Sequence, residues 1–514
     1  MKMNASPYCA IAFVLIAQGS IGCSSAEDPA INQGTPGPDE PEDSGESPAL
    51  TLEWKACTVT GIDRKDRSAE CALVDVPAKR GNTGATFPVH VTRLRGKGTI
   101  KKQVWLLAGG PGSDGASLGP YGDLLAQYLS GADVYLPDHR GTGKSNLLSC
   151  ASEDLAACGK ELKGKWGETL QVFSTTAAAY DVIDLMRNTR AEGQTTAVMG
   201  LSYGSYWAHR VLQLAPGAFD AAVFDGVCVG EKCRQDRLGE NHNEGFQEIM
   251  RACASDTFCS SKLGTDPMKA ASDVASGTGV KCGVSAKERR GLFLGVSAMD
   301  GFMLAPLVHR FKRCNANDEK VLAFAVSYMA SRESVDSSPR DRSDIGVWGR
   351  PGYSKPLGSH VRASEMTNLP LRSDAEHTKA GLALPIPYEP ASLSWVDAWP
   401  RAPRDARADQ WAKIEKPLLL GNGAFDLQTP VSIARSAKVQ LDAPSTQLVE
   451  HPTGGHVIFF ESPCTLSLLT SFLRDPTEKV DASCLQDEMP DRFKVDRGHS
   501  KVIFNTEDAW EGIL

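Results

Sequence analysis

Ser202 is the first residue in this chain whose type and setting indicate chemistry. It lies in a Gly-x-Ser-x-Gly motif at 200–204, between strand-forming residues at 195–199 and a helical pattern at 206–214. A strand, this motif and a helix together make the sharp turn that exposes a nucleophilic serine. The N-terminus of the helix favours negative charge that develops beside the hydroxyl. The pattern therefore predicts a nucleophile at Ser202, although an ordinary turn bracketed by glycines fits the motif as well.

A candidate acid and a candidate base occur later in the chain. An apolar strand pattern at 416–421 leads into a loop with Asp426, and a last strand pattern at 447–450 leads into a loop with His456. Each follows a strand, so both are expected at the sheet edge that carries the serine turn. Serine, histidine and aspartate in this arrangement form a triad for acyl transfer. His451 is the nearest alternative base, but it is too close to the strand and has no flanking glycines.

The glycine-rich residues 109–115 follow another apolar strand pattern and have two interpretations. Their spacing satisfies a dinucleotide-binding fingerprint. Alternatively, the backbone N–H of Gly109 or Gly110 and that of Tyr203 form an oxyanion hole. The N-terminal residues have the pattern of an export signal, and an exported chain seldom meets NAD. Pro111 also lacks the N–H that a pyrophosphate would need. We therefore expect an oxyanion hole here, and we predict neither a cofactor nor a metal.

Three motifs occur in a fixed order along the chain. They are Gly-Gly-Pro-Gly at 109–112, Asp-His-Arg-Gly-Thr-Gly-Lys-Ser at 138–145 and Gly-Leu-Ser-Tyr-Gly-Ser at 200–205. The set resembles the exported serine exopeptidases of the α/β-hydrolase fold, namely the proline iminopeptidase and tripeptidyl aminopeptidase group. The similarity extends over nearly all of the folded part. Ala108 departs from the pattern, because the proline iminopeptidases typically have histidine there.

The resemblance implies an α/β-hydrolase fold, in which helices flank a mostly parallel central sheet and a helical cap is inserted between two strands. The sequence agrees, because strand patterns stop for a long segment that has helical patterns such as 289–314 and polar stretches such as 331–371. We expect the first part of the core at 50–227, the cap at 228–412 and the rest of the core at 413–514. Such a cap selects the substrate and excludes water.

The N-terminus has the pattern of an export signal. Residues 8–17 form an apolar run that is too short to cross a membrane and suits a signal peptide at 1–23. Cys23 follows a small residue, as in a bacterial lipobox, and would then be acylated. Ser20 departs from that pattern, so ordinary cleavage and secretion are the alternative. The Pro-, Ser- and acid-rich segment 24–49 predicts a disordered tether.

The cysteine content agrees with export. Of 14 cysteines, 12 follow Cys23, an even number that is typical of disulfide-bonded proteins. Spacing alone does not determine their pairing, but closeness in sequence suggests bridges 57–71, 150–158, 228–233, 253–259 and 464–484, which leaves 282–314.

The charge balance excludes one class of partner. The formal net charge is −8, and the sequence has no basic block. This composition argues against nucleic acid. After the first 23 residues no stretch is long and apolar enough to span a bilayer, so the predicted membrane link is an acyl group on Cys23 alone.

Three glutamates in the predicted cap recur every four residues. Glu240, Glu244 and Glu248 therefore fall along one face of the helical pattern at 240–253. The simplest interpretation is a solvated acidic stripe. In the alternative, one or two of the carboxylates bind the α-ammonium group of a peptide and set its distance from Ser202.

These residues predict an exported serine hydrolase, either anchored in the cell envelope or secreted. Ser202 attacks a carbonyl carbon, His456 takes its proton, and Asp426 orients the imidazole. The triad does not distinguish amides from esters. The resemblance implies peptides as substrates, cut from their N-terminal end. A carboxylesterase acting on small esters and an inactive hydrolase-like binding protein are the alternatives.

Overall fold

A computed structural model describes residues 47–80, 84–335, 352–441, 443, 445–488, 493–494 and 498–514. The predicted signal peptide, Cys23 and most of the predicted tether lie outside the described residues. The same holds for 336–351 within the polar stretch predicted at 331–371.

The described part contains one sheet of nine strands, in the order β1-β2-β3-β5-β4-β6-β7-β8-β9. Strands β1, β2, β3 and β5 pair in antiparallel fashion, and β5, β4, β6, β7, β8 and β9 run parallel. The strands are β1 Lys55–Thr60, β2 Asp66–Pro77, β3 Thr86–Leu94, β4 Lys102–Leu107, β5 Ala132–Pro137, β6 Thr195–Leu201, β7 Ala221–Asp225, β8 Leu418–Gly423 and β9 Thr446–His451. The predicted mostly parallel sheet is confirmed.

Helices cover both faces of the sheet, as a parallel sheet requires. On one face α3 (Thr175–Thr189), α4 (Tyr203–Leu214) and α14 (Val431–Gln440) bury apolar side chains. On the other face α1 (Gly119–Tyr128) and α15 (Pro463–Arg474) do so. Successive residues of β4 alternate between these two clusters, as the pleat of a strand dictates.

The chain between β7 and β8 is helical. The helices are α5 Leu238–Ser255, α6 Thr257–Leu263, α7 Pro267–Ser276, α8 Ala286–Met299, α9 Leu304–Arg313, α10 Ala316–Val335, α11 Lys355–Glu365, α12 Asp374–Leu382 and α13 Trp395–Ala398. The single helix predicted at 289–314 is wrong, because α8 ends at Met299. The Asp300 carboxylate accepts a hydrogen bond from the N–H of Phe302 at 2.9 Å and starts a new turn there.

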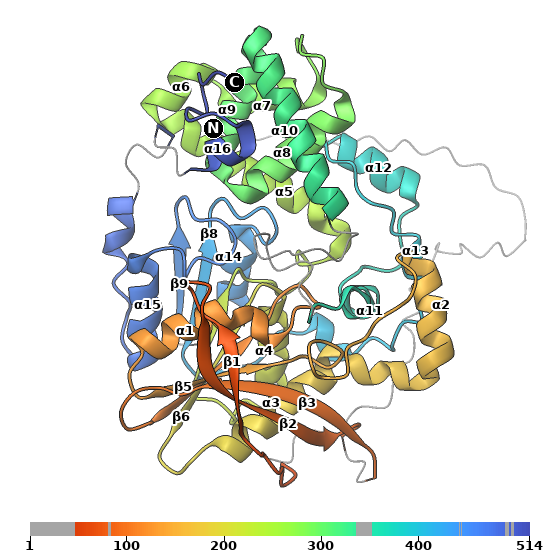
Figure 1. The fold of residues 1–514 in the computed structure, drawn as a ribbon, viewed down its shortest axis with the longest axis vertical. Coiled ribbons are helices and arrows are strands. Elements are labelled where there is room, and N and C mark those ends of the chain that lie inside the picture. Colours follow the sequence, from red (N-terminus) through yellow and green to blue (C-terminus); the bar gives the residue numbers. More distant parts are fainter. Residues whose placement is uncertain are drawn as a thin grey trace, which may run out of the picture. The chain divides into compact units, whose positions relative to one another are not determined.

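Most of these helices contribute to one of two apolar clusters. Helices α5 to α10 form a cluster of their own, and α11 and α13 pack onto the sheet cluster that contains α3 and α4. The C-terminal helix α16 (His499–Phe504) lies with α5 to α10 (Figure 1). The assignment of all of 413–514 to the core is therefore wrong for this last segment. Buried Arg310 explains the difference, because its guanidinium donates to the backbone carbonyls of residues 508, 509 and 512.

Six disulfides lie within the described part, and they have the pairing suggested by sequence proximity. The bridged Cα atoms are 5.2 to 5.9 Å apart, which is the usual range for this bond. The predicted connectivity is confirmed. Four of the bridges close loops of fewer than 15 residues, so they act mainly on local structure.

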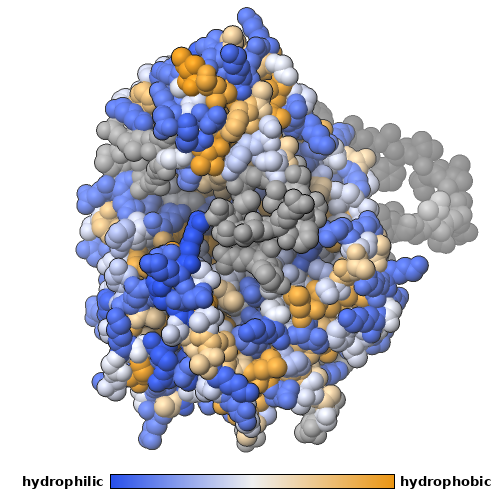
Figure 2. Space-filling view, viewed as in Figure 1, coloured by the Kyte–Doolittle hydropathy of each residue, from blue (hydrophilic) through white to orange (hydrophobic). Residues whose placement is uncertain are grey.

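On the described part of the face drawn in Figure 2, hydrophilic side chains predominate and apolar ones occur in smaller groups. The most exposed large apolar side chains, among them Leu73, Tyr128, Val439 and Ile513, lie far apart in sequence. Among the described helices, none combines the length and the apolar character that crossing a membrane requires.

Candidate active site

Ser202 lies at a strained turn between β6 and α4. Its φ and ψ are 57° and −127°, a conformation that costs energy for any residue with a Cβ. A Cβ on Gly200 would lie 2.1 Å from the Gly204 carbonyl oxygen, and one on Gly204 would lie 2.0 Å from that of Leu107. Both positions therefore require glycine, and the chain turns sharply enough to lift the serine out of strand and helix.

Hydrogen bonds hold the backbone on both sides of this turn. The N–H of Ser202 donates to the carbonyl of Asp225 at 2.8 Å. The Ser205 hydroxyl donates to the Ser202 carbonyl at 2.6 Å and accepts from the N–H of Cys228 at 2.8 Å. The Ser202 hydroxyl itself has no hydrogen bond to the described residues. The backbone around Ser202 is thus fixed while its hydroxyl stays available.

Asp426 follows β8 and is completely buried. One carboxylate oxygen accepts the N–H groups of Gln428 at 2.8 Å and Thr429 at 2.9 Å. The other oxygen accepts the Thr429 hydroxyl at 2.7 Å and lies 2.8 Å from Nδ1 of His456. Asn422 supports this loop by donating to the Thr429 carbonyl at 2.8 Å. These contacts on both oxygens fix the orientation of the carboxylate.

His456 follows β9 and directs Nδ1 at Asp426, so Nε2 is the nitrogen left to accept a proton. Burial lowers the pKa of the imidazole, but Asp426, followed by Asp225 and Glu461, outweighs burial and raises the pKa above its ordinary value of 6.5. The side chains of Ser202 and His456, both in the described part, are not hydrogen-bonded to each other. In free enzymes such a contact often forms only when substrate binds.

Ser202 and His456 nevertheless both lie against the end of β7. The N–H of Ser202 contacts the Asp225 carbonyl, and a Cβ on Gly226 would come within 3.1 Å of Cε1 of His456. Ser202, Asp426 and His456 therefore follow the ends of β6, β8 and β9, on one edge of the sheet. Of the sequence-predicted residues, the structure joins Asp426 to His456 directly and brings Ser202 to the adjoining strand end.

The loop after β4 lies beside Ser202. A Cβ on Gly109 would lie 3.0 Å from Cβ of Ser202. Among the described residues, no hydrogen bond occupies the N–H of Gly109 or that of Tyr203. The carbonyl of Gly110 accepts the Arg362 guanidinium at 3.0 Å, which ties this loop to α11. Backbone N–H groups in this position could stabilise an oxyanion formed at Ser202.

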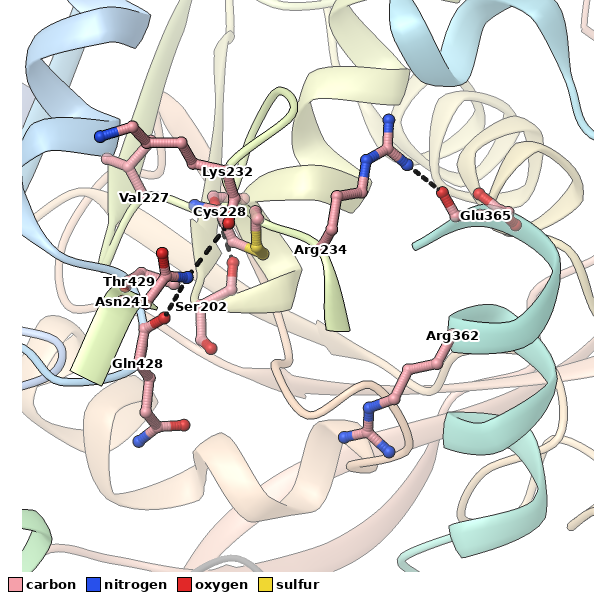
Figure 3. The surroundings of a disulfide bond; sticks show 12 residues. Ser202, Val227, Cys228, Lys232, Arg234, Asn241, Arg362, Glu365, Gln428 and Thr429 are labelled. Atoms are coloured by element: carbon pink, nitrogen blue, oxygen red, sulfur yellow. Dashed lines mark hydrogen bonds between the residues drawn. A yellow bond between two sulfur atoms is a disulfide. The ribbon is translucent and has the colours of Figure 1, made fainter. Parts of the chain in front are cut away.

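The Cys228–Cys233 disulfide closes a short loop directly after β7. Figure 3 shows Ser202 beneath this bridge, and it shows Arg362 extending from α11 on another side. The Asn241 amide donates to the carbonyls of Lys232 at 3.0 Å and Gln428 at 3.3 Å. The start of α5 is therefore linked both to the disulfide loop and to the loop that carries the acid.

The three predicted cap glutamates all lie on α5 and all have cationic partners. Glu240 pairs with Arg237 and Glu248 with Arg251, both as local surface pairs. Glu244 contacts Lys232 at 2.9 Å and also accepts the Ser432 hydroxyl of α14. The stripe is thus paired along its length, as a solvated face would be.

His451 has a different partner from His456. It is buried at the end of β9, and its Nε2 lies 2.9 Å from the Glu488 carboxylate.

In the described residues, no group of three or more His, Cys, Asp or Glu side chains has an arrangement that could hold a metal ion.

Three polar residues of this region were not predicted from the sequence. Asn422 and Thr429 hold the acid loop, and Asp225 accepts two backbone N–H groups from the loop after His456. The only sequence signal for Asp225 is its position at the end of a strand, because backbone donors have no sequence signature. Thr429 is signalled only by its distance of three residues from the acid.

Two segments of the chain match known protein families. Residues 104–261, which contain Ser202, match the family described as alpha/beta hydrolase fold. Residues 391–484, which contain Asp426 and His456, match the family described as TAP-like protein. Among curated proteins, none matches the chain by sequence.

The solved structures that match this chain are distant in sequence. A serine hydrolase from the bacterium Cycloclasticus zankles is 13% identical with a TM-score of 0.36, and the match covers 82% of this chain and 98% of that one. A probable hydrolytic enzyme from Pseudomonas aeruginosa is 12% identical with a TM-score of 0.37, covering 82% and 99%. Acetyl xylan esterase 1 from Thermoanaerobacterium is 12% identical with a TM-score of 0.35, covering 84% and 90%.

Proposed function

We propose that this α/β hydrolase, whose C-terminal region is TAP-like, is a serine aminopeptidase that releases residues or short peptides from the N-terminal end of peptides. The observation that carries the serine-hydrolase part of the proposal is the contact between buried Asp426 and half-buried His456, at 2.8 Å, on the sheet edge that carries the Ser202 turn. Three donors from Gln428 and Thr429 hold Asp426 in place, so its contact with Nδ1 fixes the orientation of the His456 imidazole.

In the proposed reaction, Oγ of Ser202 attacks the scissile carbonyl carbon as its proton passes to Nε2 of His456. The N–H groups of Tyr203 and of Gly109 or Gly110 stabilise the oxyanion. The C–N bond then breaks, and the leaving amine takes the proton from Nε2. Water attacks the acyl-enzyme through the same base and releases the acid.

The substrate class rests on two supports. The motifs around Ser202 resemble exported exopeptidases, and the TAP-like match extends over both Asp426 and His456. A carboxylesterase is the alternative, and one observation favours it. All three glutamates on α5 are already paired with cations, so an α-ammonium group would have to compete with Arg or Lys for them.

Peptides with free and blocked N-termini test the substrate class. If the proposal is correct, kcat/KM for N-acetylated chromogenic peptides should be at least about tenfold below that for the free amines, because losing one partner of a shielded charge pair is costly. Glu244→Gln should raise KM for free-amine peptides and leave short acyl esters nearly unchanged. Glu240→Gln, which alters a surface pair of the same helix, serves as the control.

Three outcomes distinguish the alternatives. Equal rates for blocked and free peptides would remove the aminopeptidase assignment. Hydrolysis of esters alone would assign a carboxylesterase. Failure of all substrates, together with no labelling by a fluorophosphonate probe, would assign an inactive binding protein.

We also propose that the enzyme is exported and anchored by an acyl group on Cys23. The apolar run at 8–17 and the small residue before the cysteine support this anchor. The mature protein should partition into detergent, and mass spectrometry should find the acyl mass on its first residue. A soluble product that begins near Ser24 or Ala26 would instead show simple secretion.

A further inference from the structure

Asp225 is the last residue of β7 and is completely buried. Its backbone carbonyl accepts the N–H of Ser202 at 2.8 Å. One carboxylate oxygen accepts the N–H of Ile458 at 2.8 Å, and the other accepts the N–H of Phe459 at 2.9 Å. A single residue thus bonds to the nucleophile turn through its main chain and to the histidine loop through its side chain.

The histidine loop needs such a restraint because its backbone is strained. Val457, directly after His456, has a φ of 70°. This region is strongly unfavourable for a β-branched side chain and persists only where the surroundings impose it. The two N–H groups whose hydrogen bonds Asp225 accepts belong to Ile458 and Phe459, which directly follow Val457. The Asp225 carboxylate therefore holds the backbone on the C-terminal side of the strained residue.

A carboxylate suits this position better than a neutral side chain. Two parallel N–H donors require two acceptor oxygens, whereas an amide offers one oxygen and one donor. In the described part, no lysine or arginine pairs with Asp225. A buried carboxylate without a cation is costly, so apolar packing would be the cheaper choice if only stability mattered.

We propose that Asp225 is a positioning residue of the active site. Its carboxylate holds the 457–459 turn in the geometry that places His456 between Asp426 and Ser202, and its negative charge stabilises the imidazolium. This inference rests on the proposed function, because it assigns Asp225 a role in the reaction of that triad.

The electrostatics of the site support this role. Burial raises the pKa of Asp225 to about 7, against the lowering effect of the N–H groups of Phe459 and Ile458. Glu461 raises this pKa further, and His456 lowers it. In turn Asp225 contributes to the raised pKa of His456, together with Asp426 and Glu461. Removing the Asp225 charge should therefore lower the pKa of His456.

Asp225→Asn tests the proposal. The amide keeps the size but sets its NH2 against one backbone N–H, so the histidine loop should shift. A misplacement of this kind typically costs about 100-fold in kcat, and KM should change little. The acidic limb of kcat/KM reports protonation of His456 and, in the wild-type protein, of Asp225 as well, since the pKa of Asp225 is about 7. It should move to lower pH by about half a unit or more in the variant, because both the charge and the second titrating group are lost. A purely structural role would leave that limb in place.

The matched control is Asp133→Asn. Asp133 is also buried, and it accepts the N–H of Gly96 at 2.9 Å, but it lies near the start of β5. This variant should lower Tm without changing the pH limb or kcat. If Asp225→Asn behaves in the same way, Asp225 is only structural and the proposal is overturned.

A second variant keeps the test informative if Asp225→Asn folds poorly. Glycine adopts a φ of 70° without strain, so adding Val457→Gly to Asp225→Asn should restore folding and recover kcat several-fold. No recovery in the folded double variant would contradict the proposed restraint.

An NMR titration separates this proposal from the proposed function. The midpoint for protonation of the His456 ring should be lower in Asp225→Asn than in the wild-type protein, whether or not any substrate is cleaved. If the wild-type protein cleaves nothing but the midpoint moves, the proposed function fails and the coupling of Asp225 to His456 stands. If the protein is active and the midpoint does not move, the coupling is rejected.

Discussion

Ser202→Ala is expected to lower kcat by about a million-fold, the loss typical of removing the nucleophile from a serine triad. The fold should be unaffected. The Ser202 hydroxyl bonds to none of the described residues, and the N–H that holds the turn to Asp225 remains in alanine. The φ of 57° is equally strained for both residues. Turnover of a chromogenic peptide, labelling by a fluorophosphonate and thermal unfolding would measure the three consequences.

Ser205→Ala is the matched control for this variant. Ser205 is also buried near the turn, but its hydroxyl bridges the Ser202 carbonyl and the N–H of Cys228. Its loss should lower Tm and leave fluorophosphonate labelling at Ser202 intact. If Ser202→Ala retained activity within tenfold of the wild-type protein, the nucleophile would lie elsewhere.

The parts of the fold that were predictable depend on short-range patterns. Apolar runs that end in glycine or a polar residue located β4, β6, β8 and β9, and the candidate site follows the ends of these strands. The disulfide pairing was predictable because it is also short-range. Five of the six disulfides join cysteines that are at most 20 residues apart in the sequence.

The parts that could not be predicted depend on contacts between distant residues. The break between α8 and α9 follows from the side-chain cap at Asp300, which periodicity does not contain. The position of α16 beside α5 to α10 follows from hydrogen bonds between Arg310 and carbonyls about 200 residues away. Helical periodicity placed Glu240, Glu244 and Glu248 on one face, but it did not reveal that each of them has a cationic partner.

Asp426→Asn should lower kcat by about ten-thousand-fold and leave KM near its wild-type value. The amide oxygen can keep the N–H groups of Gln428 and Thr429, so the loop stays in place. The amide nitrogen then faces Nδ1 of His456, where the carboxylate oxygen was, at 2.8 Å. A donor there favours the imidazole tautomer with its proton on Nε2, which cannot accept the proton of Ser202.

The pH dependence gives this variant a second signature. Asp426 is the largest of the influences that raise the pKa of His456, against the lowering effect of burial. Without its charge the pKa should fall, and the acidic limb of the residual kcat/KM should move to lower pH. A steady-state pH profile measures both effects. Asp405→Asn is the control, because Asp405 pairs with Arg210 at 2.9 Å and not with His456. If Asp405→Asn caused the larger loss of kcat, Asp426 would not be the acid, and the loop after β8 would need another role.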